Sequence, residues 1–571
     1  MKLNRGFSFL LLALGALLAA TGPVATAQVM PSPVIPVVGG ITTVSADPTV
    51  PRPDADHCTV NLFTNMEFAD FNTKNFTFTP PAPKYCSGPW SKVVLRVDFT
   101  VTKGRQYDRT AQFYLGGAIL YFGTTAEPRG NVIPFWHVES DVTDLAPLLT
   151  TPQAGTALLG NFVGVYNGVD YNGIIYANAN LDFYATDAKN PPAVVPNQVI
   201  GLTGNGGSYA LNNPNSVYTQ SLTLPKNVIG AYLDVVAQSQ SADEFWYTCV
   251  PSALSTVLES CGDTAFRETE ITIDGTPAGV APVYPWVFTG GIDPFLWEPI
   301  PGVQTLNFKP FRVDLTPFAG QLSNGKTHTV GVQVYNADSY FSLTGNLLLY
   351  TDPVLTEVTG KVTGNTLTAE PTPEIVNNIT SDGNGDAYGS VVTRSNRSYK
   401  ITGNVTTSLG LKETVVSQDV TFNQTAIFTV DAAEDLQDIT QSTTAYGGTT
   451  TYVGGVATSQ FSTFSYPFTL NYGFTSNPDG TYSQTTQASQ KWLYNYSQVQ
   501  GSEAQYKSTT SNSVTAEDTL NYDANFNFTG NTGTKSSQTY NSLDSEGNCY
   551  SRTLTAANLK LTGVTDGAAC Q

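Results

Sequence analysis

Four segments in the first half of the chain recur in the same order 158 to 173 residues later. The pairs are residues 141–146 with 314–319, residues 163–167 with 332–336, residues 180–184 with 346–350, and two expected strands that begin at Arg109 and Arg267 and end at Gly116-Gly117 and Asp274-Gly275. One such match is common between unrelated β-strands, whereas four in one order indicate an internal duplication. Generic strand similarity is the alternative explanation.

The local residue pattern is that of β-strands. Between Val93 and Val101, apolar residues at alternate positions place Leu95, Val97 and Phe99 on one face. Long helical periodicity is absent, and 50 Gly and 34 Pro residues supply turns. We therefore predict an all-β protein. It comprises two tandem jelly-roll-like β-sandwiches, residues 56–195 and 196–355, and a Thr/Ser-rich C-terminal β domain, residues 356–571.

Residues 1–27 have the pattern of a signal peptide. Lys2 and Arg5 precede an apolar run over residues 7–20, and Ala25-Thr26-Ala27 fits a cleavage site. An uncleaved membrane anchor is the alternative, although the run is short for a bilayer span. Residues 28–55 are rich in Pro, which is typical of an extended linker. We expect a secreted or periplasmic protein.

Charge and cysteine content limit the partners. A net charge of -19 disfavours nucleic acid and anionic membranes as binding partners. Six cysteines without a CxxC motif indicate disulfides rather than a zinc site in an exported chain. Closeness in sequence pairs Cys58 with Cys86, Cys249 with Cys261, and Cys549 with Cys570, which is one of the fifteen connectivities that six cysteines allow. We expect a monomer without metal or cofactor.

Carboxylates and arginines are the strongest candidates for chemistry. The three histidines (His57, His137 and His328) lie in no HExxH motif, and GxSxG and P-loop motifs are absent. Acidic and basic residues gather at residues 104–109 with 124–129 and at 261–268, and a third cluster, at 286–299, combines tryptophans, Gly290-Gly291 and Glu298. If the sandwiches pack side by side, the matched Arg109 and Arg267 would place these clusters at one cleft. Ordinary surface ion pairs are the alternative.

Several of these stretches resemble the peptide-N4-(N-acetyl-β-glucosaminyl)asparagine amidase A (PNGase A) family, which has acid-active bacterial relatives. They are Gly104-Arg105-Gln106-Tyr107-Asp108-Arg109, Thr125-Ala126-Glu127-Pro128-Arg129, the run from Phe288 through Gly290-Gly291 to Trp297, and Asp314-Leu315-Thr316-Pro317-Phe318. The resemblance covers about residues 60–350 and resumes more weakly near Cys549.

A fainter likeness to the PNGase F family suggests roles for individual residues. That family consists of two side-by-side jelly rolls with the site between them. Its essential aspartate and the adjoining arginine match Asp108 and Arg109. Its second carboxylate, a glutamate, falls on Asp263, and Glu268 competes for that role. The third cluster has Glu298 where plant members of the PNGase A family carry an arginine.

The resemblance implies a secreted amidase that hydrolyses the bond between asparagine and the first N-acetylglucosamine of an N-glycan. Its substrate would be an N-glycopeptide or glycoprotein. The implied catalytic residues are Asp108, Arg109, Asp263 and Glu268, and the implied substrate-binding residues are Arg267, Glu127, Arg129, Trp297 and Trp246. A core position is the alternative for each tryptophan. The rival functions are a non-catalytic secreted glycan-binding or adhesion protein and an endoglycosidase.

Overall fold

A computed structural model describes residues 36–127, 132–204, 206–383 and 385–570. The expected signal peptide, the first part of the expected linker and Arg129 lie outside these residues. The described chain is built mainly of β-strands, which confirms the all-β prediction. Its helices are one or two turns long, such as α2 (Pro83–Cys86) and α3 (Ala319–Leu322). No helix within the described residues has the length and apolarity that a bilayer span requires.

The first sandwich consists of two four-stranded antiparallel sheets with a shared aromatic core. One sheet has the order β1 (His57–Phe68), β10 (Ile175–Tyr184), β3 (Lys92–Val101), β6 (Phe135–Asp141). The other has the order β2 (Lys74–Phe78), β7 (Gln153–Leu159), β4 (Thr110–Leu115), β5 (Ala118–Thr124). Phe99 of the first sheet stacks on Phe113 of the second with ring centroids 5.9 Å apart. Burial of such rings holds the two layers together.

The second sandwich repeats this arrangement. One sheet has the order β11 (Gln198–Gly201), β19 (Tyr340–Thr351), β14 (Val228–Gln240), β17 (Phe311–Asp314), and β12 (Tyr209–Leu211) also pairs with β19. The other has the order β13 (Val217–Thr223), β18 (Thr327–Tyr335), β15 (Glu268–Ile273), β16 (Thr276–Pro282). In both sandwiches the chain crosses repeatedly between the two facing sheets, apart from the hairpins β4–β5 and β15–β16 and the neighbours β11 and β12, each of which stays in one sheet.

The strand orders support the duplication, with one exception. Strand β4 corresponds to β15, so Arg109 and Arg267 stand directly before equivalent strands, and β10 corresponds to β19. The match of residues 163–167 with 332–336 is wrong. The first segment forms β8 (Gly164–Tyr166), which pairs only with β9 (Val169–Tyr171), whereas the second lies at the end of the core strand β18.

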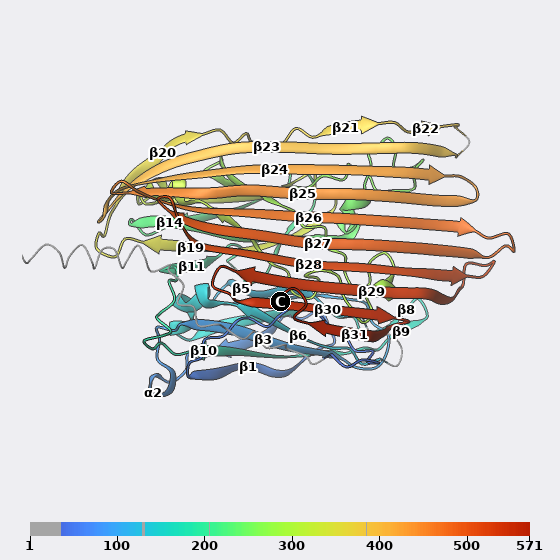
Figure 1. Cartoon of the computed structure of the whole chain (residues 1–571), viewed down its shortest axis with the longest axis horizontal. Helices are drawn as coiled ribbons and strands as arrows, with labels where there is room; N and C mark the ends of the chain where they lie inside the picture. Colours follow the sequence, from blue (N-terminus) through green and yellow to red (C-terminus); the bar gives the residue numbers. More distant parts are fainter. Residues whose placement is uncertain (1–35, 128–131, 205, 384, 571) are drawn as a thin grey trace, which may run out of the picture.

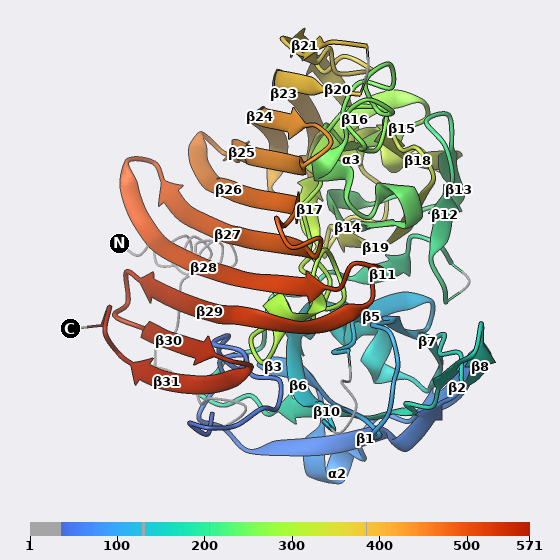
Figure 2. The same cartoon turned by 90° about the vertical axis from the view of Figure 1, so that its right-hand side faces the viewer.

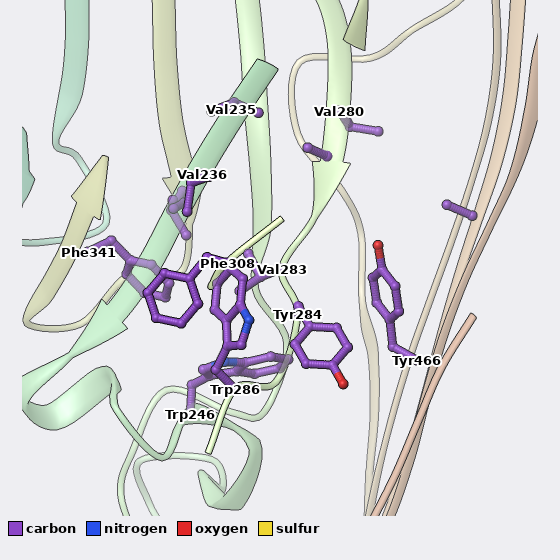
Figure 3. Packing of buried hydrophobic residues seen from close by; sticks show 14 of the residues in the cluster. Val235, Val236, Trp246, Val280, Val283, Tyr284, Trp286, Phe308, Phe341 and Tyr466 are labelled. Atoms are coloured by element: carbon purple, nitrogen blue, oxygen red, sulfur yellow. The ribbon is translucent and has the colours of Figure 1, made fainter. Parts of the chain in front are cut away.

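Residues 359–566 form one long antiparallel sheet that covers the second sandwich (Figures 1 and 2). Its main strands are β20 (Thr359–Asn365), β23 (Ala387–Thr407), β24 (Gly410–Val430), β25 (Glu434–Val453), β26 (Val456–Ser476), β27 (Tyr482–Gln500), β28 (Glu503–Tyr522), β29 (Phe528–Asp544), β30 (Cys549–Ala557) and β31 (Lys560–Asp566). Strands β21 (Glu374–Asn377) and β22 (Thr380–Ser381) pair with β23. Figure 3 shows Tyr284, just after β16, beside Tyr466 of β26, and their ring centroids lie 4.9 Å apart. The second sandwich and the long sheet therefore share one hydrophobic core.

Residues 36–55 are packed against three parts of the molecule. The Gly39 amide donates to the Leu561 carbonyl at 2.7 Å, and the Leu561 amide donates to the Gly40 carbonyl at 2.9 Å. The Val44 amide donates to the Pro299 carbonyl at 2.9 Å, and Arg52 pairs with Glu139 of β6 at 2.5 Å. This segment, which we call the strap, is thus bound to the long sheet and to both sandwiches instead of forming the free linker that its composition suggests.

Three disulfides close local loops. They join Cys58 to Cys86, Cys249 to Cys261, and Cys549 to Cys570, as sequence proximity predicts. By restricting the unfolded chain, a disulfide that closes a loop of this length stabilises the folded state by about 3 kcal/mol.

A buried ion cluster joins the long sheet to the second sandwich. Arg397 of β23 lies 2.5 Å from Glu268 and 3.0 Å from Glu270, and all three side chains are nearly inaccessible to solvent. Removing one member of such a cluster leaves an unpaired buried charge.

Arg397→Ala should therefore lower the free energy of unfolding by about 3–5 kcal/mol, measured by urea denaturation. The matched control is Arg394→Ala on the same strand, whose guanidinium is half exposed and lies 3.9 Å from Glu374. That change should cost under about 1 kcal/mol. Equal effects of the two substitutions would contradict the structural role of the cluster.

Candidate active site

Asp108 lies where the two sandwiches meet. It stands in the loop between β3 and β4, and its Oδ2 accepts a hydrogen bond from the Gly290 amide of the second sandwich at 3.1 Å. Next to it, the Thr289 hydroxyl donates to the Thr125 carbonyl at 2.8 Å. These bonds fix the loop between β16 and β17 against the first sandwich. Asp108 remains partly accessible to solvent.

Gly290 brings Asp108 and Glu127 together. A Cβ atom at this position would lie 2.3 Å from Glu127 Oε2 and 3.1 Å from Asp108 Oδ1. Both carboxylates thus lie against the same backbone position. The absence of a side chain at Gly290 allows this approach.

Arg109 is held beside these carboxylates. Its Nη2 donates to Gln106 Oε1 at 2.7 Å, and its guanidinium lies 5.6 Å from the centre of the Tyr107 ring. Burial lowers the pKa of Arg109, and the charges of Asp108 and Glu127 oppose that shift. Its Nε is buried and has no hydrogen-bond partner among the described residues. Leaving this N–H unpaired is costly, whereas Arg109 as a whole remains partly accessible to solvent.

Glu244 is the acidic residue that the second sandwich contributes. Burial and the nearby charge of Asp108 raise its pKa to about 7. The preceding strand β14 is fixed to the first sandwich at its end, where Gln240 Nε2 donates to Thr110 Oγ1 at 2.6 Å. A carboxyl group with this pKa is protonated in mild acid and can act as a general acid.

A buried ion pair lies next to Glu244 in the chain. Asp243, at the end of the 3₁₀ helix η2 (Ser241–Asp243), pairs with Arg267 at 3.0 Å. Asp243 also accepts the backbone amides of Ser339 and Tyr340 at 2.8 and 3.1 Å. The pair fixes the start of the loop that carries Glu244.

Two of the four residues expected to be catalytic lie outside this cluster. Glu268 is 1% exposed and is bound by Arg397 of the long sheet, so a catalytic role for it is wrong. Asp263 accepts the Ser252 hydroxyl at 2.8 Å and has a φ of 64° in a loop turn. Its neighbouring charges are Asp338 and Arg267. We place Asp263 outside the site.

Most of the residues expected to bind substrate are structural. Arg267, Trp297 and Trp246 are 2%, 2% and 0% exposed, so none offers a surface to a ligand. Trp297 Nε1 donates to the Gly291 carbonyl at 3.0 Å and supports the Gly290 loop. Trp246 packs with Phe422 of the long sheet. Glu127 lies in the cluster, and Arg129 lies outside the described residues.

The duplication contains a signal for Glu244 that inspection of the charged clusters missed. Asp108 lies in the loop between β3 and β4, and the equivalent loop of the second sandwich, between β14 and β15, carries Glu244. The charged cluster at residues 261–268 lies at the opposite end of that long loop, next to Arg267. Gln106 and Gly290 fall within the motifs, but no residue pattern assigns them a role.

The fold and the site define a protein of two jelly-roll-like sandwiches with carboxylates and an arginine at their seam. Residues 48–368 match the model of the family described as peptide N-acetyl-β-D-glucosaminyl asparaginase amidase A. The chain belongs to this family.

The chain is similar in sequence to one curated protein and in structure to several solved proteins, among them PNGF-II and PNGase F. Peptide-N4-(N-acetyl-β-glucosaminyl)asparagine amidase A of Prunus dulcis is 30% identical over 375 residues, which span 62% of this chain and 63% of the relative. The chain thus matches less than two thirds of that relative's length. Two solved structures each match 52% of this chain. PNGF-II has a TM-score of 0.35 and 14% sequence identity, and the match covers 65% of that chain. PNGase F of Flavobacterium meningosepticum, a glycosylasparaginase, has a TM-score of 0.33 and 14% identity, and the match covers 96% of that chain.

Proposed function

We propose that the protein is a secreted glycoamidase that hydrolyses the amide between asparagine and the first N-acetylglucosamine of an N-glycan. The observation that carries the proposal is the meeting of the two sandwiches at Asp108, which the Gly290 amide binds, with Arg109 beside it and with Glu244 close enough for the charge of Asp108 to raise its pKa. Family membership supports the reaction class. The N-terminal pattern of the sequence and three disulfides support secretion.

Asp108 activates the water in this mechanism. Its Oδ2 is held by the Gly290 amide, so its carboxylate has a fixed orientation toward the seam. The carboxylate accepts a proton as the water oxygen bonds to the amide carbon of the substrate asparagine. The carbonyl π electrons move onto the oxygen, and the positive charge of Arg109, which lies beside Asp108, stabilises this oxyanion.

Glu244 then protonates the leaving nitrogen. The C–N bond breaks as the carbonyl re-forms, and the nitrogen leaves as a glycosylamine with the proton from Glu244. The peptide retains the water oxygen in a new aspartate side chain. Because the pKa of Glu244 is about 7, the group carries its proton at mildly acidic pH, where a histidine would be charged.

The proposal is tested by mass spectrometry of a glycopeptide incubated with the enzyme at mildly acidic pH in heavy-oxygen water. We expect a sugar-free peptide in which aspartate, carrying one heavy oxygen, replaces asparagine. An endoglycosidase would leave one N-acetylglucosamine on an intact asparagine, and a lectin would leave the mass unchanged. Either result would overturn the assignment.

Gly290→Ala should reduce kcat/KM by about 10²-fold, because the new methyl group would displace the carboxylates of Glu127 and Asp108. Thermal unfolding should change little, since those two side chains are partly exposed and can move. Gly364→Ala in β20 is the matched control, because nothing lies within 4 Å of the added atom. Undiminished activity of Gly290→Ala would show that this contact does not shape the site.

A further inference from the structure

A cavity of about 430 Å³ lies away from the candidate active site, where the strap meets both sandwiches and the long sheet. Its wall includes Asp47 of the strap, Glu139 of β6, Lys309 just before β17, and Trp492 and Tyr540 of the long sheet. Its volume falls in the range of small-ligand sites. None of these residues has a role in the amidase mechanism.

Aromatic rings form one side of this cavity and continue beyond it. Trp492 stacks on Tyr494 with centroids 5.6 Å apart and planes inclined by 26°, and Tyr494 lies 6.4 Å from Tyr496. Both tyrosines line a second cavity of about 180 Å³. All three rings are partly exposed, since β27 presents alternate side chains to one face. We call these three residues the aromatic row.

Polar groups line the opposite side of the larger cavity. Lys309 makes no hydrogen bond or ion pair with any of the described residues, although it lines the cavity wall. The carboxylate of Asp47 accepts hydrogen bonds from Asn512 at 2.6 Å and Gln538 at 3.0 Å. Glu139 is bound by Arg52 and His137 at 2.5 and 3.0 Å. The Lys309 side chain is exposed, so its ammonium donors are open to the hydroxyl groups of a ligand.

The charges around Lys309 balance one another. The carboxylates of Asp47, Asp141 and Glu139 act on its ammonium group and oppose the lowering of its pKa by the surrounding protein atoms. Arg52 and His137 in turn neutralise Glu139. The cavity therefore offers donors and acceptors without a large net charge. An aromatic face opposite such groups fits a ring that has an apolar C–H face and a rim of hydroxyl groups.

We propose that this cavity is a second, non-catalytic carbohydrate site that binds an uncharged pyranose unit, with the sugar face on Trp492 and its hydroxyl groups on Lys309 and Asp47. The aromatic row offers further rings to the next sugars of a chain. This proposal does not depend on the proposed amidase function, because the cavity shares no residue with the candidate active site.

The test is isothermal titration of the full chain with three free neutral disaccharides: chitobiose, mannobiose and lactose. None contains the glycosyl-amide bond, so no turnover interferes. We expect saturable binding of at least one of them. Trp492→Ala and Lys309→Met should each weaken that binding about tenfold or more. Lys309→Met keeps the length of the side chain and should preserve packing. It therefore provides the test if the Trp492→Ala protein does not fold.

Two control variants separate this site from other surfaces. Tyr446→Ala removes a half-exposed ring of the same sheet that lines neither cavity, and Glu127→Gln alters the candidate active site. Both should bind the disaccharide as the unaltered chain does. The proposal is overturned if no disaccharide binds saturably, if binding survives both Trp492→Ala and Lys309→Met, or if Glu127→Gln alone abolishes it.

Discussion

Asp108→Asn should reduce kcat/KM for glycan release by about 10²–10⁴-fold. The asparagine side chain has nearly the same shape and can still accept the Gly290 amide, but it cannot take a proton from water. The fold should be retained, because Asp108 is partly exposed and the substitution keeps the size of its side chain. Release is measured by mass spectrometry, and unfolding by urea denaturation.

Asp263→Asn is the informative comparison for Asp108→Asn. Asp263 accepts one hydroxyl hydrogen bond in its own loop, so its replacement should change kcat/KM less than about tenfold. A loss as large as that of Asp108→Asn would return Asp263 to the site. Full activity of Asp108→Asn would remove Asp108 from it.

Glu244→Gln should lower kcat about 10²-fold or more and should change the pH profile. The folded-state pKa of Glu244, about 7, is raised by burial and by Asp108, so the group is protonated below this pH. Activity that depends on its proton is therefore present in mild acid and is lost as the pH rises through about 7. Glutamine cannot donate an acidic proton, so the alkaline limb near pH 7 should disappear from the variant.

The pH profile distinguishes this role from simple packing. A packing role would lower activity by the same factor at every pH, whereas an acid role removes one ionisation from the profile. Glu503→Gln, at the exposed start of β28, is the matched control and should leave both kcat and the profile unchanged. A Glu244→Gln enzyme that keeps the alkaline limb would contradict the assignment.

The repeated segments of the sequence predicted the paired sandwiches because equivalent strands keep equivalent residues. Arg109 and Arg267 do precede equivalent strands, although only Arg109 lies in the candidate site. The two loops that precede β4 and β15 differ greatly in length. The likeness to the PNGase F family placed the second carboxylate at Asp263, close to the arginine, whereas the candidate carboxylate Glu244 lies at the other end of the longer loop.

The errors at Glu268 and at the tryptophans have a common physical cause. Neighbouring residues of a strand point to opposite faces, and the face that Glu268 occupies is covered by the long sheet. Trp246 packs against Phe422 of the same sheet. The sequence indicated strands in residues 356–571, but alternation alone does not reveal which other surface a strand will cover.

The strap also constrains the order in which the molecule can be completed. The Ala46 amide is bound to the side chain of Gln538, 492 positions further along the chain, and Gly39 is bound to Leu561 in the last strand. The strap therefore cannot complete its docking until the residues up to Leu561 have been synthesised. Contacts of such sequence separation are slow to form. A chain cut short before β29 would leave the strap without these anchors and would remove Tyr540 from the wall of the large cavity.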